Sequence, residues 1–318
     1  MQLETMQLTE AQKGRFSLLW FKIRRNAGLY FLILPALVYI IIFNFIPMYG
    51  ILIAFQNFKP FLGVAGSDWV GLHHFKRFFG LNAFGSLMKN TLTLSLYGLV
   101  AGLPMPVLLA LLLNMCISKR LKKIVQVVTY APHFISTVVF VGIINVFFSP
   151  SLGIVKTILN TVGLLDGPLM TLLNPDAFPH LYVWSGVWQG MGWGSIIYLA
   201  ALTGIDVEIQ EAAYVEGATK LQQVWYIDLP TIIPTIVTML ILSCGSILNV
   251  GFEKVFLMQN TLNLQTSEII STYVYKVGIL DTQYSYSAAI GIFNSVINLA
   301  LLISVDRISK AMGQRGLF

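Results

Sequence analysis

The sequence has few charged residues and almost no cysteine. Only 11% of its 318 residues are charged and 56% are hydrophobic, with a mean hydropathy of +0.75. Soluble domains carry about 25% charged residues, so this composition excludes an ordinary soluble domain and predicts a polytopic membrane protein. The two cysteines, Cys116 and Cys244, lie in or beside apolar runs. Neither a disulfide framework nor a cysteine metal site is therefore expected.

Catalytic and nucleotide-binding motifs are also missing. The chain has no GxxxxGK[ST] phosphate loop, no Gly-x-Ser-x-Gly elbow and no pair of acids at metal-ligand spacing. His73 and His74 are adjacent and point in different directions in any regular structure, so no metal site is expected. The net charge of +6 does not indicate nucleic acid, because the basic residues cluster beside apolar runs. We expect no enzyme activity, no cofactor bound by this chain and no nucleic-acid partner.

What the chain does contain is a series of six apolar runs, each about long enough to cross a bilayer as a helix. They cover approximately residues 29–55, 90–116, 125–148, 181–204, 231–251 and 286–305. The first run is too long for a signal peptide and no small-residue cleavage site ends it, so it is expected to remain. The predicted fold class is an all-α membrane protein with six transmembrane helices over residues 28–308. Tails of residues 1–27 and 309–318 flank this domain, and residues 16–21 are expected to lie on the membrane surface.

Basic residues predict the orientation of the six spans. Six crossings place both termini, the basic turn at residues 119–123 and the loop at residues 205–230 on one side. That side holds 13 of the 20 Lys and Arg residues. Because cytoplasmic segments carry an excess of Lys and Arg, both termini are predicted to be cytoplasmic.

Formal charges are almost absent from the apolar runs, which carry neutral polar and aromatic side chains instead. Ion-coupled carriers usually bury ionisable residues along their path. Amides and aromatic rings suit a sugar, because its hydroxyls need hydrogen bonds and its CH faces stack on rings. The alternative is that the amides join helices and the tryptophans form an interfacial belt. The candidate substrate-path residues are Gln189, Trp188, Tyr198, Asn249 and Asn294.

The loop at residues 205–230 is a polar segment between two apolar runs, with five acids against one lysine, Lys220. It reads IDVEIQEAAYVEGATKLQQVWYIDLP. This length predicts two short helices, with Gly217 between them because glycine permits a reversal at little steric cost. Pro230 is expected to end the second helix, just before the fifth apolar run.

The order of residues in this loop resembles the EAA loop of permease subunits from binding-protein-dependent ABC importers. Glu211-Ala212-Ala213, then Gly217, then Ile227-x-Leu229-Pro230 match that pattern at both spacings. At the position directly before this glycine Asp is more usual in the EAA loop. Glu216 occupies that position here and carries the same negative charge. Weaker similarities to the oligosaccharide/polysaccharide branch of carbohydrate permeases occur at residues 47–55, 69–72, 90–91, 132–136 and 193–200.

This resemblance implies the six-helix type I importer fold, with a cytoplasmic loop coupled to ATPase subunits. It implies a bacterial cytoplasmic (inner) membrane location and half of a translocation path for an oligosaccharide or polysaccharide. The implied partners are a second permease subunit, two cytoplasmic ATPase subunits that carry ATP and Mg, and an external solute-binding protein. The implied coupling residues are Glu211, Ala212, Ala213, Gly217, Leu229 and Pro230.

An alternative function is an ATP-independent secondary carrier or channel for a neutral polar solute. Such a protein would need ionisable residues inside the membrane or duplicated halves, and the sequence has neither. A subunit that senses or scaffolds without transport is a third class. The identity, length and charge of the cargo stay open at this point.

Overall fold

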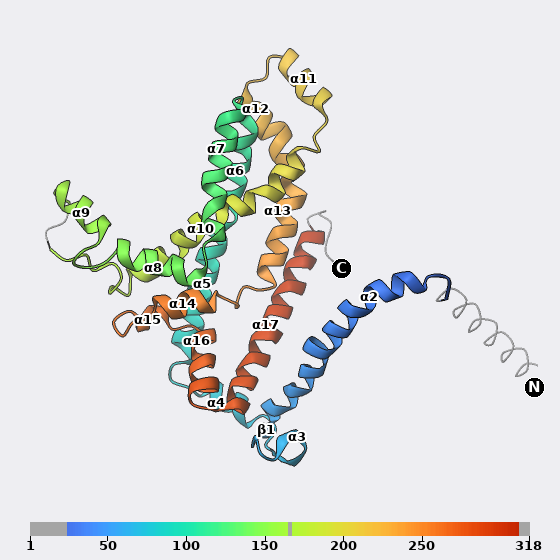
Figure 1. Ribbon diagram of the computed structural model, residues 1–318, viewed down its shortest axis with the longest axis vertical. Coiled ribbons are helices and arrows are strands. Elements are labelled where there is room, and N and C mark those ends of the chain that lie inside the picture. The colour runs from blue at the N-terminus through green and yellow to red at the C-terminus, as the bar shows by residue number, and fades with distance from the viewer. Residues whose placement is uncertain (1–23, 165–166, 312–318) are drawn as a thin grey trace, which may run out of the picture. The chain divides into compact units, whose positions relative to one another are not determined.

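The structure is a computed structural model that describes residues 24–164 and 167–311. The expected surface helix at residues 16–21 and residues 312–318 of the expected C-terminal tail lie outside the described residues. Contacts divide the chain into a smaller unit of residues 1–70 and a larger unit of residues 71–318. Apart from one two-stranded sheet in the smaller unit, the regular elements of the described residues are helices (Figure 1).

The smaller unit contains the first candidate span, an unbroken helix over Ala27–Phe55. It begins as α2 (Ala27–Ile40), widens to a π-helical turn η1 (Ile41–Phe45) and tightens to the 3-10 segment η2 (Ile46–Phe55). Nearly all of its large apolar side chains are exposed, as expected for a helix surrounded by lipid. After this helix in the chain, β1 (Gln56–Asn57) pairs antiparallel with β2 (Asp68–Trp69), and α3 (Gly63–Gly66) belongs to the segment that connects the two strands.

The larger unit holds the remaining candidate spans and their connections. Its elements before residue 205 are α4 (His73–Phe79), α5 (Phe84–Gly102), α6 (Pro104–Met115), α7 (Lys119–Tyr130), η3 (Ala131–Phe134), α8 (Thr137–Phe147), α9 (Ile154–Thr161) and α10 (Ala177–Leu202). The later elements are α11 (Val207–Val215), α12 (Lys220–Gln223), η4 (Val224–Asp228), α13 (Leu229–Cys244), α14 (Phe252–Met258), α15 (Leu264–Ser267), α16 (Ile270–Tyr275), η5 (Lys276–Leu280) and α17 (Tyr284–Ala311). In Figure 1, α11 and α12 lie at one end of this unit and α4 and α16 lie toward the other.

The number of spans agrees with the six expected if each bent helix pair crosses once. Four helices of the described residues are long and apolar enough by themselves: Ala27–Phe55, Phe84–Met115, Lys220–Cys244 and Tyr284–Ala311. Two further pairs pass the same test together. Lys119–Phe134 and Thr137–Phe147 are bent by 103°, and Ala177–Leu202 and Val207–Val215 are bent by 81°.

The expected third span, residues 125–148, is therefore not one straight helix. The helix breaks between Phe134 and Thr137, just after the short 3-10 turn η3, whose second residue is Pro132. Ser136 then caps α8 by accepting the N–H of Val139. The side-chain amide of Gln189 donates to the carbonyl of Ile135 at 3.2 Å. A broken helix is tolerated in a membrane protein where neighbouring side chains satisfy the freed backbone groups.

The expected boundaries of the fifth span were also wrong. The helix begins at Lys220 and ends at Cys244 instead of spanning residues 231–251, and Pro230 lies inside it instead of ending a helix. Proline in a helix clashes with the carbonyl four residues earlier, which here belongs to Tyr226. That residue lies in the π-helical turn η4, whose wider backbone accommodates the ring.

Helix α10 is the central element of the larger unit. It packs against α5, α6, α7 and α13, and its buried residues contribute to three apolar clusters. It approaches α7 closely at Gly192, where an added β-carbon would overlap the carbonyl group of Thr129. Small residues allow helix backbones to approach closely in membrane proteins, so Gly192 sets the distance between these two helices.

Candidate functional site

The segment from Asp206 to Pro230 forms a helix, a turn and a second helix, as its sequence predicts. Asp206 caps α11 by accepting the N–H of Glu208 at 3.0 Å. At the other end Gly217 has φ +81°, and its N–H bonds to the carbonyl of Tyr214 at 3.0 Å. The N–H of Ala218 bonds to the carbonyl of Ala213 at 2.9 Å. These two bonds form a Schellman motif, which requires a left-handed residue and explains why glycine stands at this distance from the EAA triplet.

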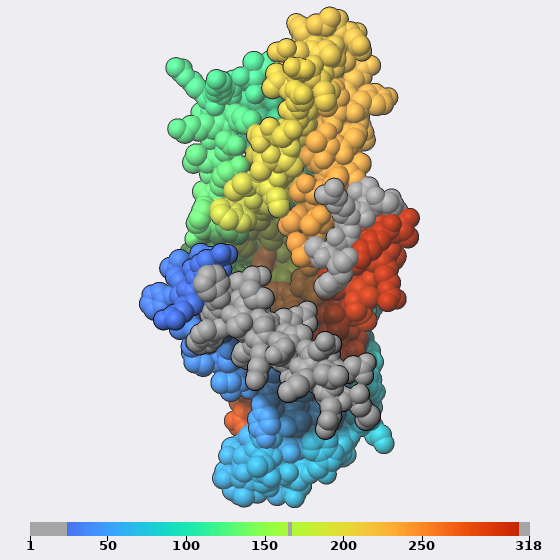
Figure 2. Space-filling model, turned by 90° about the vertical axis from the view of Figure 1, so that its right-hand side faces the viewer, coloured from blue at the N-terminus to red at the C-terminus, as the bar shows by residue number. Residues whose placement is uncertain are grey.

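The first helix of this segment presents its side chains to the surroundings. None of the residues of α11 is buried, and Tyr214 and Val215 are 78% and 84% exposed. Glu211 and Ala212 are exposed, Ala213 is half-buried, and Glu211 forms no ion pair with any described residue. Figure 2 shows the segment that contains α11, in yellow, at one end of the larger unit. An exposed helix with large apolar side chains is a surface suited to a protein partner.

The second half of the motif lies in the helix that leads into the fifth span. Leu229 is half-buried against the cluster of Val107, Tyr198 and Val224, whereas Pro230 is exposed. Asp228, directly before Leu229, is 4% exposed, and its Oδ2 accepts from Nδ2 of Asn114 at 3.0 Å. This bond joins η4 to α6. The motif treats position 228 as any residue, so the sequence gives no signal for this buried carboxylate.

A cavity of about 520 Å³ lies in the larger unit between α5, α6, α10, α13 and residues 246–254. Its volume is within the range of roughly 300–1,000 Å³ typical of small-molecule sites. Three of the candidate path residues, Gln189, Tyr198 and Asn249, line it. Tyr182, Gly186, Ser243, Ser246 and Lys254 also line it.

The other two candidate path residues lie outside the lining of this cavity. Trp188 is 50% exposed and stacks on Phe140, with ring centroids 5.8 Å apart. Asn294 belongs to α17, and its buried Oδ1 has no hydrogen-bond partner among the described residues. Of the three residues in the lining, Asn249 is exposed and accepts a 3.4 Å bond from Asn298. The proposed contact of any of these five residues with cargo stays a prediction.

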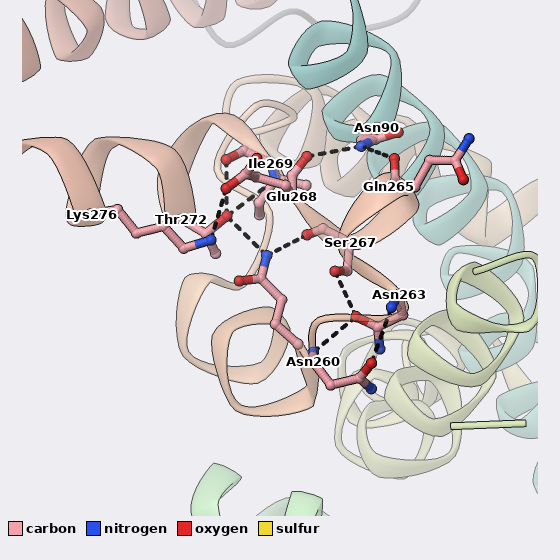
Figure 3. Close-up of polar contacts among 10 residues, drawn as sticks. Asn90, Asn260, Asn263, Gln265, Ser267, Glu268, Ile269, Thr272 and Lys276 are labelled. Atoms are coloured by element: carbon pink, nitrogen blue, oxygen red, sulfur yellow. Dashed lines mark hydrogen bonds and ion pairs between the residues drawn. The ribbon is translucent and has the colours of Figure 1, made fainter. Parts of the chain in front are cut away.

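The connection between the fifth and sixth spans is held to the helices by a buried polar network (Figure 3). Asn90 of α5 donates from Nδ2 to the carbonyls of Gln265 and Glu268, both at 2.9 Å. Asn263, which is 1% exposed, accepts from Ser267 at 2.9 Å and donates to the carbonyl of Met258 at 3.0 Å. Because buried polar groups need partners, this network fixes α14, α15 and α16 against α5.

Two further observations limit the chemistry of the chain. Within residues 24–164 and 167–311, no group of three or more His, Cys, Asp or Glu side chains is arranged to hold a metal ion. Lys254 is the charged residue of the cavity lining. It could not be recognised in the sequence, because a charged residue that follows an apolar run is typical of an ordinary loop.

Comparison with known proteins identifies the family. Residues 102–314 match the model of the family described as binding-protein-dependent transport system inner membrane component. The polygalacturonan/rhamnogalacturonan transport system permease protein YteP of Bacillus subtilis (strain 168) is 41% identical over 96% of this chain and 95% of its own length. The arabinooligosaccharides transport system permease protein AraP of the same organism is 28% identical over 91% of each chain.

A solved structure of similar fold covers nearly the whole chain. It is a chain of a bacterial ABC transporter involved in the import of the acidic polysaccharide alginate. Its TM-score is 0.86 and its sequence identity 38%, over 93% of this chain and 99% of that chain. The expected six-helix permease fold is thereby confirmed. The present chain belongs to the family of binding-protein-dependent inner-membrane transport components and is a permease subunit of an ABC importer, not an enzyme.

Proposed function

We propose that this chain forms one half of the translocation path of an ATP-driven importer for an oligosaccharide or polysaccharide. The observation that carries the proposal is the cavity beside α10, whose wall places the amides of Gln189 and Asn249 and the phenol of Tyr198 together. Such groups donate and accept hydrogen bonds without a charge, as sugar hydroxyls require. The relatives YteP and AraP are both named as saccharide transport permeases, which supports the same cargo class.

The proposed complex also contains a second permease subunit, two ATPase subunits that carry ATP and Mg, and an external solute-binding protein. Both termini and the segment at residues 205–230 would face the cytoplasm, as the distribution of Lys and Arg favours. In this arrangement α11 docks into the ATPase through Glu211, Ala212 and Ala213. Gly217, Leu229 and Pro230 connect that contact to the fifth span. ATP-driven closure of the ATPases would move this segment and open the path on the opposite side.

Reconstitution into proteoliposomes tests the proposal. Uptake of labelled oligosaccharides is measured with the second permease, the ATPase and the binding protein all present, and then with each left out. Uptake that needs ATP and every component supports the proposal. Uptake that persists without the ATPase identifies the carrier or channel alternative. A complete complex that hydrolyses ATP but takes up none of a panel of saccharides contradicts the proposed cargo class.

Glu211→Lys is expected to lower ATP-dependent uptake by at least roughly thirtyfold while the protein still inserts into the membrane. Glu211 is exposed and unpaired among the described residues, so the substitution leaves the fold intact. Truncating one member of a charge pair at an interface costs about 2–5 kcal/mol, and reversal adds repulsion. The measurement is uptake together with co-purification of the ATPase. Glu253→Lys makes the same charge change at an exposed acid of α14 and is the control. Normal uptake and normal ATPase binding in Glu211→Lys would remove this residue from the coupling contact.

Asn249→Ala is expected to change the ratio of uptake rates for two saccharides by about fivefold, because one hydrogen bond is worth roughly 0.5–1.5 kcal/mol. Asn249 lines the cavity and is exposed there. The measurement is competition between two labelled oligosaccharides that differ in one hydroxyl. Asn160→Ala is the matched control, since Asn160 is an exposed asparagine of α9 that lies outside the lining. Equal effects of both substitutions on selectivity would mean that the cavity does not determine it.

A further inference from the structure

Lys254 is a cation at the cavity wall that the proposed coupling and transport roles leave unused. It belongs to α14, outside the candidate spans, and only 9% of it is exposed. Its Nζ donates to the carbonyl of Tyr182 at 2.8 Å. The same nitrogen lies 4.8 Å and 5.2 Å from the ring centroids of Tyr182 and Phe140. A β-carbon at Gly186 would come within 3.1 Å of it, so a glycine of α10 leaves room for the ammonium group.

The ammonium group of Lys254 has no carboxylate partner among the described residues. Their ion pairs are Lys59–Asp68, Lys276–Glu268 and Lys310–Asp306. A lysine ammonium carries three N–H donors, and the carbonyl of Tyr182 accepts from one of them. Burial lowers the pKa of Lys254 to about 7, because a buried site disfavours the charged form. A buried cation without an ion-pair partner is costly, and its position in a cavity makes it a candidate functional group.

The rest of the cavity wall is electrically neutral. Lys254 is the single residue with a formal charge among the described residues that line it. An anionic group entering the cavity would therefore meet one cation and no acid. Its negative charge would favour the charged form of the lysine. The hydrogen bond between an ammonium and a carboxylate is roughly twice as strong as one between neutral groups.

We infer that Lys254 binds the carboxylate of a uronate unit in the cavity and makes the path selective for acidic over neutral saccharides. This inference rests on the proposed function, because it presupposes a saccharide cargo. The carboxylate accepts hydrogen bonds from the N–H donors of Nζ that Tyr182 leaves available. The amides of Gln189 and Asn249 then face the hydroxyls of the same sugar chain. The competing role is structural, with the stem and ammonium of Lys254 merely packing α14 against Tyr182 and Phe140.

The test compares two cargoes in the reconstituted complete complex. One is a tetramer of galacturonate, and the other is the same tetramer with every carboxylate reduced to a primary alcohol. Uptake is measured for the wild type, Lys254→Met, Lys254→Arg and Glu253→Gln. Methionine keeps an unbranched apolar stem and removes the charge, whereas arginine keeps the charge. Glu253→Gln removes an exposed charge from the neighbouring position of α14.

Lys254→Met is expected to raise the KM for the galacturonate tetramer about tenfold or more, since hydrogen bonds to charged groups are among the strongest. Its uptake of the reduced tetramer changes less than twofold, and its thermal stability does not fall. Lys254→Arg retains most of the acidic uptake, and Glu253→Gln behaves as the wild type. If the wild type does not transport the reduced tetramer, the inference is tested by comparing the uptake of the galacturonate tetramer by Lys254→Met with its uptake by Lys254→Arg.

Three results would overturn the inference. The first is acidic uptake by Lys254→Met at the wild-type level. The second is an equal loss of both cargoes accompanied by lower thermal stability, which is the signature of a packing residue. The third is a wild type that imports the reduced tetramer but not the acidic one. A wild-type complex that imports neither tetramer and no other saccharide contradicts the proposed function itself, so the two failures are distinguishable.

Discussion

Gly217→Pro is expected to abolish ATP-dependent uptake while the protein still inserts and its spans still assemble. Gly217 has φ +81°, and proline is fixed near −65°, so the turn between α11 and α12 cannot keep its geometry. Proline also lacks the N–H that bonds to the carbonyl of Tyr214. The Schellman motif is lost, and α11 with Glu211 and Ala212 points in a new direction. Uptake and saccharide-stimulated ATP hydrolysis in proteoliposomes measure the effect.

Graded substitutions at Gly217 separate backbone geometry from side-chain bulk. Nothing lies within 4 Å of a β-carbon added at this position, so any loss comes from backbone strain. Asparagine tolerates the left-handed region, and Gly217→Asn is expected to retain most uptake. A β-branched residue there is a genuine outlier, and Gly217→Val is expected to behave like Gly217→Pro. Full uptake by Gly217→Pro with normal coupling to ATP hydrolysis would show that the turn transmits nothing.

Gly192→Ala is expected to destabilise the protein by about 3 kcal/mol, at the upper end of the range for overpacked sites. The added methyl group would overlap the backbone carbonyl of Thr129 and come within 2.9 Å of the N of Tyr130. A backbone cannot rotate away as a flexible side chain can, so α7 and α10 must separate along their crossing. The measurements are the yield of folded protein in detergent and its midpoint of thermal unfolding.

Gly190→Ala is the matched control for this prediction. It makes the same substitution two residues earlier in α10, where no atom lies within 4 Å of the added β-carbon. Gly190 is half-buried at the cavity wall. Because the added methyl group meets no atom and alanine is the better helix former by about 1 kcal/mol, this variant is expected to be at least as stable as the wild type. Equal stability of both variants would mean that α7 and α10 do not cross at Gly192 as described.

The long apolar runs predict the helical fold because a span needs only enough apolar residues to cross the membrane. They do not predict where a span bends. Residues 125–148 are apolar on both sides of Pro132 and Ser136, so hydropathy alone gives no sign of the 103° break. The start of the fifth span was missed for the opposite reason. Residues 220–230 are mixed in polarity, yet they form a continuous helix with α13.

The two parts of the candidate site differed in how far the sequence could predict them. The turn at Gly217 is local, because its hydrogen bonds join residues three and five apart, so the spacing of the motif was sufficient to predict it. The cavity depends on contacts between helices distant in sequence. Trp188 and Gln189 are neighbours in the chain, but only Gln189 lines the cavity. Lys254 reaches the carbonyl of Tyr182, 72 residues away, and only the tertiary fold reveals its burial.

The continuity of α12, η4 and α13 has a mechanical consequence. At 1.5 Å per residue, the 25 residues from Lys220 to Cys244 form a rod of about 37 Å. One end of this rod adjoins the exposed turn at Gly217, and the other adjoins Ser246 and Asn249 in the cavity wall. Asp228 is bonded to Asn114 of the neighbouring helix near the first end, and we predict that the rod tilts about this bond. Such a tilt would convert a small displacement of the short arm, before residue 228, into a larger sideways movement of the long arm beside the cavity.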